Sequence, residues 1–93
     1  MNVAMLRLEL LVIGCPTLHE KRRRIRAMID KLHRHFNVSV AEVDRYDPLS
    51  EAVLGVAAVG ATRKQALDML DRVTDAVGAH PRAQLVGHAI REA

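Results

Sequence analysis

Aromatic side chains are almost absent from this sequence. Phe36 and Tyr46 are the only two in 93 residues, and tryptophan is missing altogether. The core must therefore be built from aliphatic side chains. RNA-binding sheets of the common recognition-motif type stack bases on strand aromatics. None of the strands predicted below contains one, so we expect no reading of an RNA or DNA sequence across the sheet.

Cysteine and long apolar runs are also scarce. Cys15 is the single cysteine, so no disulfide can form within the chain, and a lone thiol suits a reducing cytoplasm. Crossing a bilayer takes about 18–20 apolar residues. The apolar segment 3–13 is interrupted by Arg7 and Glu9, and no small-residue cleavage site follows it. We therefore expect a cytoplasmic protein with no membrane span and no signal peptide.

Histidines are present, but not at spacings that favour a metal centre. His33 and His35 are two positions apart in a predicted helix, so they point in different directions and cannot chelate one ion as an i, i+4 pair can. The other three histidines, His19, His80 and His88, are isolated. We expect neither a metal nor another cofactor.

A group of carboxylates is the best candidate for catalytic chemistry. Glu42, Asp44 and Asp47 lie around the end of the second predicted strand, and such a group can hold Mg²⁺ or transfer protons. Edge-strand charges and a helix cap at Asp47 explain the same residues without chemistry. No nucleophile with a neighbouring base accompanies them. We therefore expect no enzymatic activity.

Composition and apolar periodicity predict one small domain spanning residues 1–93. Hydrophobic residues make up 49% of the chain and charged residues 27%, which suits a folded protein rather than a disordered one. The predicted strands cover residues 3–13, 38–43, 53–59 and 82–90. Two helices are predicted after capping-box patterns at 17–20 and 62–65. Their apolar residues recur at helical spacing to Phe36 in the first and to Val77, before Gly78, in the second.

The order of these elements predicts an α+β fold. Right-handed crossovers in a β-α-β-β-α-β chain favour a ferredoxin-like sandwich, in which a four-stranded antiparallel sheet carries both helices on one face. In the first strand the even positions from Ala4 to Val12 are all apolar and should face the core. The first and third strands are the most apolar, so we place them at the centre of the sheet.

Several segments resemble a known family. Residues 18–22 read Leu-His-Glu-Lys-Arg after the first strand, and residues 36–43 read Phe-Asn-Val-Ser-Val-Ala-Glu-Val. Together with Leu54-Gly55-Val56 and His80-Pro81, they resemble the YlxP-like family of small uncharacterised bacterial proteins along nearly the whole chain. The family usually reads Ser-Leu-Lys-Glu-Lys-Arg at the first segment, so Thr17 and His19 depart from it. The resemblance implies a ferredoxin-like fold and a link to translation, but no reaction and no site residues.

Positive charge is concentrated in the first predicted helix. Seven cations lie between residues 19 and 35, against Glu20 and Asp30, so this helix carries +5 while the whole chain carries only +3 and the remainder −2. The cations are Lys21, Arg22, Arg23, Arg24, Arg26, Lys31 and Arg34. Such a surface suits the phosphates of an anionic partner. We expect a non-catalytic accessory protein whose basic helix binds RNA or a ribonucleoprotein, with the ribosome as the preferred partner.

Two other interpretations remain open at this point. The cations can instead form a solvated helix face, with arginine stems covering the edges of the core. The uncovered face of the sheet would present Met5, Leu11 and Ile13, and an apolar patch on an open sheet usually marks an interface. A homodimer that uses this face, with no role in nucleic-acid binding, is therefore the alternative hypothesis.

Overall fold

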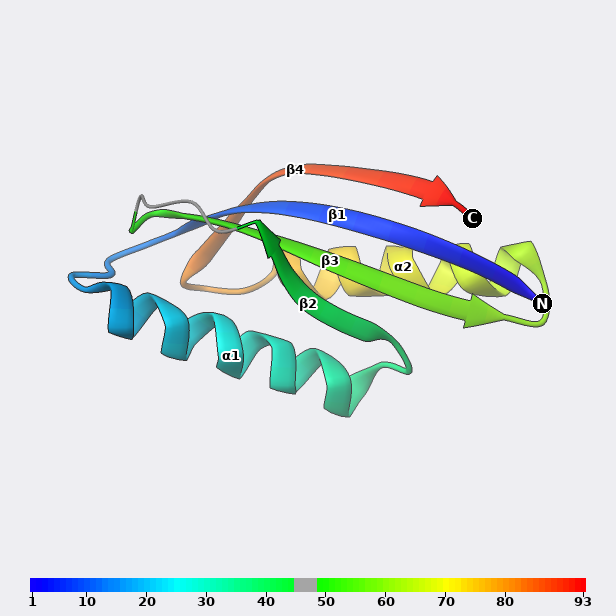
Figure 1. The fold of residues 1–93 in the computed structure, drawn as a ribbon, viewed down its shortest axis with the longest axis horizontal. Coiled ribbons are helices and arrows are strands. Elements are labelled where there is room, and N and C mark those ends of the chain that lie inside the picture. The colour runs from blue at the N-terminus through cyan, green and yellow to red at the C-terminus, as the bar shows by residue number, and fades with distance from the viewer. Residues whose placement is uncertain (45–48) are drawn as a thin grey trace.

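The computed structural model describes residues 1–44 and 49–93 and has the predicted element order (Figure 1). The elements are β1 (Asn2–Val12), α1 (Leu18–His35), β2 (Ser39–Asp44), β3 (Glu51–Gly60), α2 (Arg63–Gly78) and β4 (Ala83–Glu92). The strands form one sheet in the order β2-β3-β1-β4, and every neighbouring pair is antiparallel. The predicted α+β arrangement, with β1 and β3 at the centre, is confirmed. Residues Tyr46 and Asp47 lie outside the described residues.

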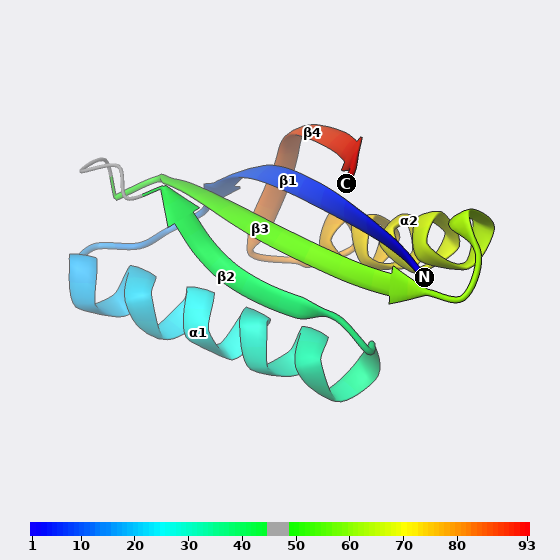
Figure 2. The ribbon, with the colours of Figure 1, turned by 45° about the vertical axis from the view of Figure 1, so that its right-hand side comes forward.

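The core lies between the sheet and its two helices. The even positions of β1 are buried as predicted, and Leu8 faces Leu54 across the pairing of β1 with β3. Figures 1 and 2 show α1 and α2 on the same side of the sheet. Helix α1 packs along β2, and α2 packs along β1 and β3. One face of the sheet is therefore covered by helices, and the other face is open.

Both helices begin at a threonine whose hydroxyl satisfies an exposed backbone amide. The Thr17 hydroxyl accepts a hydrogen bond from the amide of Glu20 at 3.1 Å. At α2 the reciprocal capping box is complete, because the Gln65 side chain also accepts from the amide of Thr62. Each helix then buries one apolar stripe against the sheet, made of Ile25, Met28 and Leu32 in α1 and of Ala66, Leu70, Val73 and Val77 in α2.

Gly60 joins β3 to α2 so closely that a side chain does not fit. A Cβ atom at this position would lie 2.8 Å from both the Thr62 carbonyl oxygen and the Ala66 amide nitrogen, which are backbone atoms. We expect Gly60→Ala to lower the free energy of unfolding by about 1–3 kcal/mol, measured by urea titration. Gly78→Ala is the matched control, because its Cβ would meet only Leu85, at 4.0 Å. Equal stability of the two variants would contradict this account of the junction.

Candidate nucleic-acid interface

Five of the seven predicted cations lie exposed on α1. They are Arg22, Arg23, Arg26, Lys31 and Arg34, which we call the basic face of α1. None of the five forms an ion pair with any residue in the ranges 1–44 and 49–93. At 100° per residue, Arg23 and Arg34 lie opposite the buried stripe. Arg22 and Arg26 lie on one flank of the helix, and Lys31 lies on the other. The basic face therefore presents five unneutralised charges to solvent.

The other two cations are held within the fold. The Arg24 guanidinium donates from Nη1 to the carbonyl oxygen of Ile13 and from Nη2 to that of Gly14, the latter at 3.1 Å. It thereby holds the turn between β1 and α1, where Gly14 has a φ of 69°. Lys21 is buried, with only 4% of its surface exposed. Its burial is inconsistent with the expectation that Lys21 contacts a partner, so we remove Lys21 and Arg24 from the contact set.

The positive charge at the start of α1 is unfavourable for the helix itself. Arg22 and Arg23 lie near its N-terminus, where the helix dipole favours anions, and Glu20 is the only acidic residue of the first turn. Helix stability alone therefore does not account for these cations. The phosphate groups of a partner would relieve their mutual repulsion and would also meet the positive end of the helix dipole.

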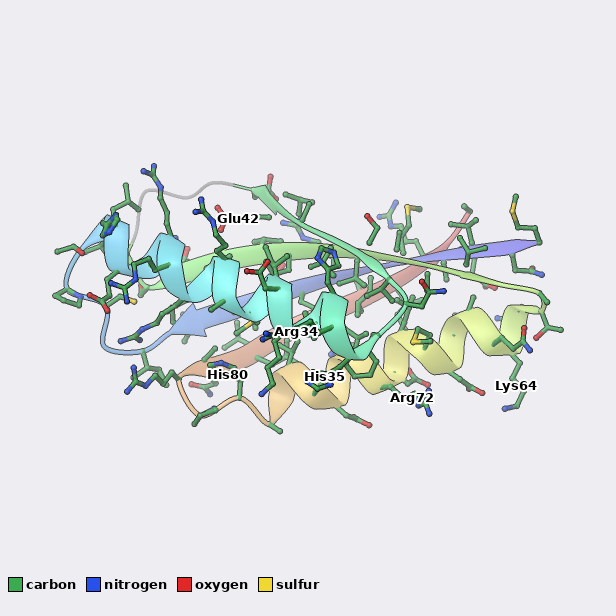
Figure 3. The ribbon with its side chains drawn as sticks, turned by 90° about the horizontal axis from the view of Figure 1, so that it is seen from below. Arg34, His35, Glu42, Lys64, Arg72 and His80 are labelled. Atoms are coloured by element: carbon green, nitrogen blue, oxygen red, sulfur yellow. The ribbon has the colours of Figure 1, made fainter. Side chains whose placement is uncertain are left out.

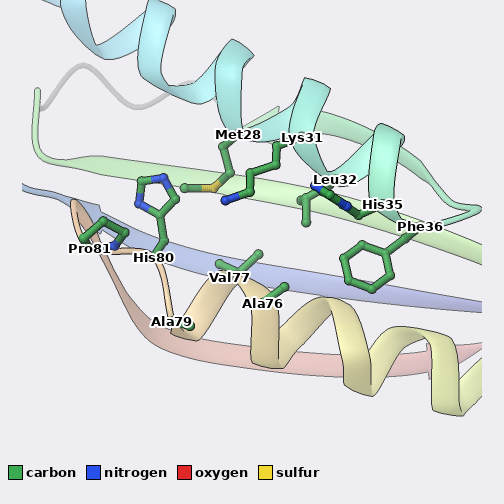
Figure 4. A pocket seen from close by; sticks show the side chains of 10 residues that line it. All are labelled: Met28, Lys31, Leu32, His35, Phe36, Ala76, Val77, Ala79, His80 and Pro81. Atoms are coloured by element: carbon green, nitrogen blue, oxygen red, sulfur yellow. The ribbon is translucent and has the colours of Figure 1, made fainter.

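A groove of about 470 Å³ lies between the two helices (Figure 4). Its lining comprises Met28, Lys31, Leu32, His35, Phe36, Ala76, Val77, Ala79, His80 and Pro81. Lys31 and His35 extend from α1 towards the groove, and His80 extends towards it from the connection between α2 and β4 (Figure 4). Figure 3, which views the helix side of the molecule, shows Arg34, His35 and His80 in one region of that side. The groove thus combines apolar walls with basic side chains.

The surroundings of the His80 imidazole favour its neutral form. Partial burial, followed by the positive charges of Lys31, Arg82 and Arg24, lowers the pKa of His80 from its ordinary value of 6.5. Its Nδ1 accepts a hydrogen bond from the amide of Arg82 at 3.2 Å, which protonation of Nδ1 would break. Neutral His80 therefore carries its proton on Nε2, the nitrogen that remains available as a donor.

This depressed pKa makes the fold less stable in mild acid. Below about pH 6.5 the unfolded chain protonates its histidine while folded His80 resists, so stability falls with pH until His80 itself is protonated. We expect His80→Gln to lose less stability than the wild type between pH 7.5 and about 5.5, measured as the urea midpoint. Gln84→Ala, an exposed change on β4 that alters no titratable group, should keep the wild-type dependence. An NMR titration that gave His80 a pKa above 6.5 would contradict this.

The predicted carboxylate group is only partly in place. The Asp44 carboxylate accepts from Arg7 Nη2 at 2.8 Å, and Glu9 lies 3.7 Å from Arg7 Nε, so both carboxylates serve an ion-pair cluster on the sheet. Glu42 is half-buried on β2, and Asp47 lies outside the described residues. Within residues 1–44 and 49–93, no three His, Cys, Asp or Glu side chains gather in a way that would hold a metal ion. No helix in the same ranges is long and apolar enough to span a bilayer.

Of the three predicted apolar residues, Met5 is displayed most clearly on the open face of the sheet. It is 44% exposed, whereas Leu11 is half-buried, and Ile13, which is 55% exposed, lies in the turn after β1 rather than in the sheet. Val59, on the neighbouring strand, is 61% exposed and adds to this surface. The charged cluster around Arg7 interrupts it. The open face is therefore a mixed surface rather than a continuous apolar patch.

Sequence reasoning missed the groove between the helices. Its two walls are at least 40 residues apart in the chain, and nothing in the local pattern shows how far α1 and α2 diverge. The burial of Lys21, in contrast, could have been predicted from the sequence. At helical spacing Lys21 falls in line with Ile25, Met28 and Leu32, inside the apolar stripe.

Comparisons with known proteins identify a family and a fold. A family model described as "Protein of unknown function (DUF503)" matches residues 3–90. The "Uncharacterized protein YlxP" of Bacillus subtilis (strain 168) is 28% identical over 76 residues, which cover 82% of this chain and 83% of that protein. The solved structure of the "De novo designed protein Foldit4" aligns with a TM-score of 0.55 at 12% identity, covering 100% of this chain and 97% of the other. That likeness concerns the fold alone.

Proposed function

The chain belongs to the DUF503 family, and we propose that it is a non-catalytic accessory protein that binds RNA or a ribonucleoprotein through the basic face of α1. The observation that carries this proposal is the set of five exposed cations with no ion-pair partner among the described residues. The remainder of the chain has a net charge of −2, so a polyanion would be drawn to α1 rather than to the molecule as a whole. The ribosome, with its phosphate-rich surface, is the partner we favour.

The chemistry of the basic face suits phosphates better than paired bases. Four of its five members are arginines, whose planar guanidinium groups bind phosphate oxygens through two parallel hydrogen bonds. Such contacts position a protein on a nucleic acid without reading its sequence. The described strands contain no phenylalanine, tyrosine or tryptophan on which a base would stack. The interaction we propose is therefore driven by charge and depends strongly on salt.

Co-sedimentation with purified ribosomal subunits at low and moderate salt tests the proposal. The test variant replaces Arg22, Arg23 and Arg26 with glutamate and leaves Arg24 in place, because Arg24 holds the turn before α1. The control for net charge replaces Lys64, Arg72 and Arg91 with glutamate; all three are exposed cations on α2 and β4, and Lys64 pairs with Asp68. Both variants change the net charge by the same amount.

The expected result is that the wild type and the control travel with a subunit at low salt and are released as salt rises. The test variant should remain in the supernatant throughout. If the wild type does not bind, or if both variants lose binding equally, the basic face of α1 is not the partner surface. Equal loss would mean that net charge, rather than this helix, governs the interaction.

A homodimer formed through the open sheet is the second candidate. It is favoured by the exposure of Met5 and Val59 on a sheet face that neither helix covers (Figure 2). Light scattering at micromolar concentration should then give twice the mass of one chain, and Val59→Glu should return the protein to the monomer mass. A monomer mass for the wild type would remove this candidate, while a dimer that binds no RNA would favour it over the first.

A further inference from the structure

The groove between α1 and α2 has the dimensions and composition of a ligand site. Its volume of about 470 Å³ lies within the range of about 300–1,000 Å³ that is usual for small-ligand pockets. Both helices contribute apolar wall, with Met28 and Leu32 from α1 facing Val77 from α2. None of the ten described residues that line it is acidic. The groove therefore favours a ligand with an apolar part and a negative charge.

Phe36 gives the groove a flat aromatic surface. It is the only phenylalanine of the chain and, with Tyr46 outside the described residues, the only phenyl ring that the structure places. Its ring lies between the end of α1 and the facing turn of α2, beside the side chain of His35 (Figure 4). Phe36 is half-buried, so part of the ring remains accessible. Phe36 also packs against the core, so its ring is held in a fixed place. An accessible aromatic ring offers a surface on which an unpaired nucleobase can stack.

The basic side chains of the groove are arranged for an anion. Lys31 is exposed and lies on the α1 wall, opposite His80 (Figure 4). His80 uses Nδ1 to accept from the backbone of Arg82, which leaves its Nε2–H as a donor without a described partner. An ammonium group and an imidazole N–H on opposite walls can bind the oxygens of one phosphate together.

The groove also opens beside the surface that we propose as the RNA contact. Lys31 belongs both to the groove lining and to the basic face of α1. Arg34, another member of that face, is next in sequence to His35, which lines the groove, and both belong to the last turn of α1 (Figure 3). A strand whose phosphates follow the basic face therefore passes the mouth of the groove.

We propose that the groove binds one unpaired nucleotide of an RNA strand, with its base against Phe36 and its phosphate against Lys31 and His80. This inference rests on the proposed function, which supplies the strand. It adds to that function a preference for single-stranded over double-stranded RNA, because a paired base cannot leave its stack to enter the groove without a cost. A free nucleotide carries the same base and phosphate as a nucleotide within an RNA strand. The experiment below therefore distinguishes binding of an RNA strand from binding of free nucleotides.

The first measurement is the dissociation constant for a short single-stranded RNA and for the duplex of the same sequence at fixed salt. The test variant is Phe36→Leu, which keeps an apolar side chain but removes the ring. Met69→Leu is the matched control, because Met69 is half-buried on α2 and does not line the groove. We expect Phe36→Leu to weaken binding of the single strand about fivefold or more and to leave duplex binding unchanged. Met69→Leu should change neither.

The second measurement is the NMR spectrum of the Phe36 ring. Its signals cannot be confused with those of another phenylalanine, because the chain has only one. Its signals should shift when single-stranded RNA is added and should show contacts to base protons. If Phe36→Leu binds both RNA forms as the wild type does and the ring signals stay in place, the groove proposal is wrong. The proposed function would still stand if Arg22, Arg23, Arg26→Glu abolished binding in the same assay.

Two further outcomes overturn the inference in different ways. If the wild type binds neither RNA form, the proposed function fails and no RNA strand reaches the groove. If nucleoside monophosphates shift the Phe36 signals and compete fully with the single strand, the groove is a site for free nucleotides instead. Two results together would support binding of a nucleotide within an RNA strand. The wild type should still bind the single strand in excess nucleoside monophosphate, and Phe36→Leu should bind that strand more weakly.

Discussion

Reversing the charge of Arg22, Arg23 and Arg26 is expected to weaken RNA binding by at least about a hundredfold at low salt. Each arginine that neutralises a phosphate releases condensed counterions, which is the main source of sequence-independent affinity. A glutamate at the same position adds repulsion to that loss. The three side chains are exposed and make no ion pair with a described residue, so the fold should survive their replacement.

A neutral version of this variant gives the sharper measurement. Changing the three arginines to glutamine should reduce the slope of log affinity against log salt by about 2, since each contact with a single strand contributes about 0.7. Fluorescence titration with a labelled single strand over a range of salt concentrations measures the slope. The corresponding glutamine changes at Lys64, Arg72 and Arg91 should leave it unchanged. Equal slopes for the wild type and the α1 variant would show that these arginines contact no phosphate.

Truncating Leu8 is expected to cause the largest loss of stability. The side chain lies on central strand β1, is 0% exposed and faces Leu54, which is also 0% exposed. Leu8→Ala would leave a cavity that neighbouring side chains cannot fill, and such changes cost about 3–5 kcal/mol. Domains of this kind have total stabilities of about 5–15 kcal/mol, so the variant should be partly unfolded or melt far below the wild type.

Met5→Ala is the matched control for Leu8→Ala. Met5 lies three positions earlier on the same strand but points to the open face, where it is 44% exposed. Its truncation should change the free energy of unfolding by less than about 1 kcal/mol. Urea unfolding of both variants measures the difference. Similar losses at the two positions would mean that the open face is covered in solution, as the homodimer hypothesis requires.

The fold was predictable because its local patterns agree with one another. The alternation from Ala4 to Val12 indicated which face of β1 is buried, and the cap at Thr62 marked the start of α2. The charge-free run from Val53 to Val59 indicated a central strand, as the sheet order confirms. Each of these signals involves residues that are close together in the sequence, so the elements and their buried faces can be predicted from the sequence.

The candidate site was less predictable, because it depends on three-dimensional placement. The net charge of α1 does not distinguish its seven cations from one another. In the fold, however, Lys21 is buried and Arg24 binds the backbone of the turn after β1. Long aliphatic stems allow such cations to lie within or beside an apolar stripe. The groove beside Phe36 depends on how two distant helices diverge, which no periodicity in the sequence encodes.

Mapping of the RNA contact by NMR tests the central claim most directly. Isotope-labelled wild-type protein is titrated with single-stranded RNA at low salt, and the backbone and arginine side-chain signals are followed. We predict that the largest changes fall on α1, at Arg22, Arg23, Arg26 and Arg34, and that the signals return towards their free positions as salt is added. Changes confined to the open sheet around Met5 and Val59, or no changes at all, would contradict the account.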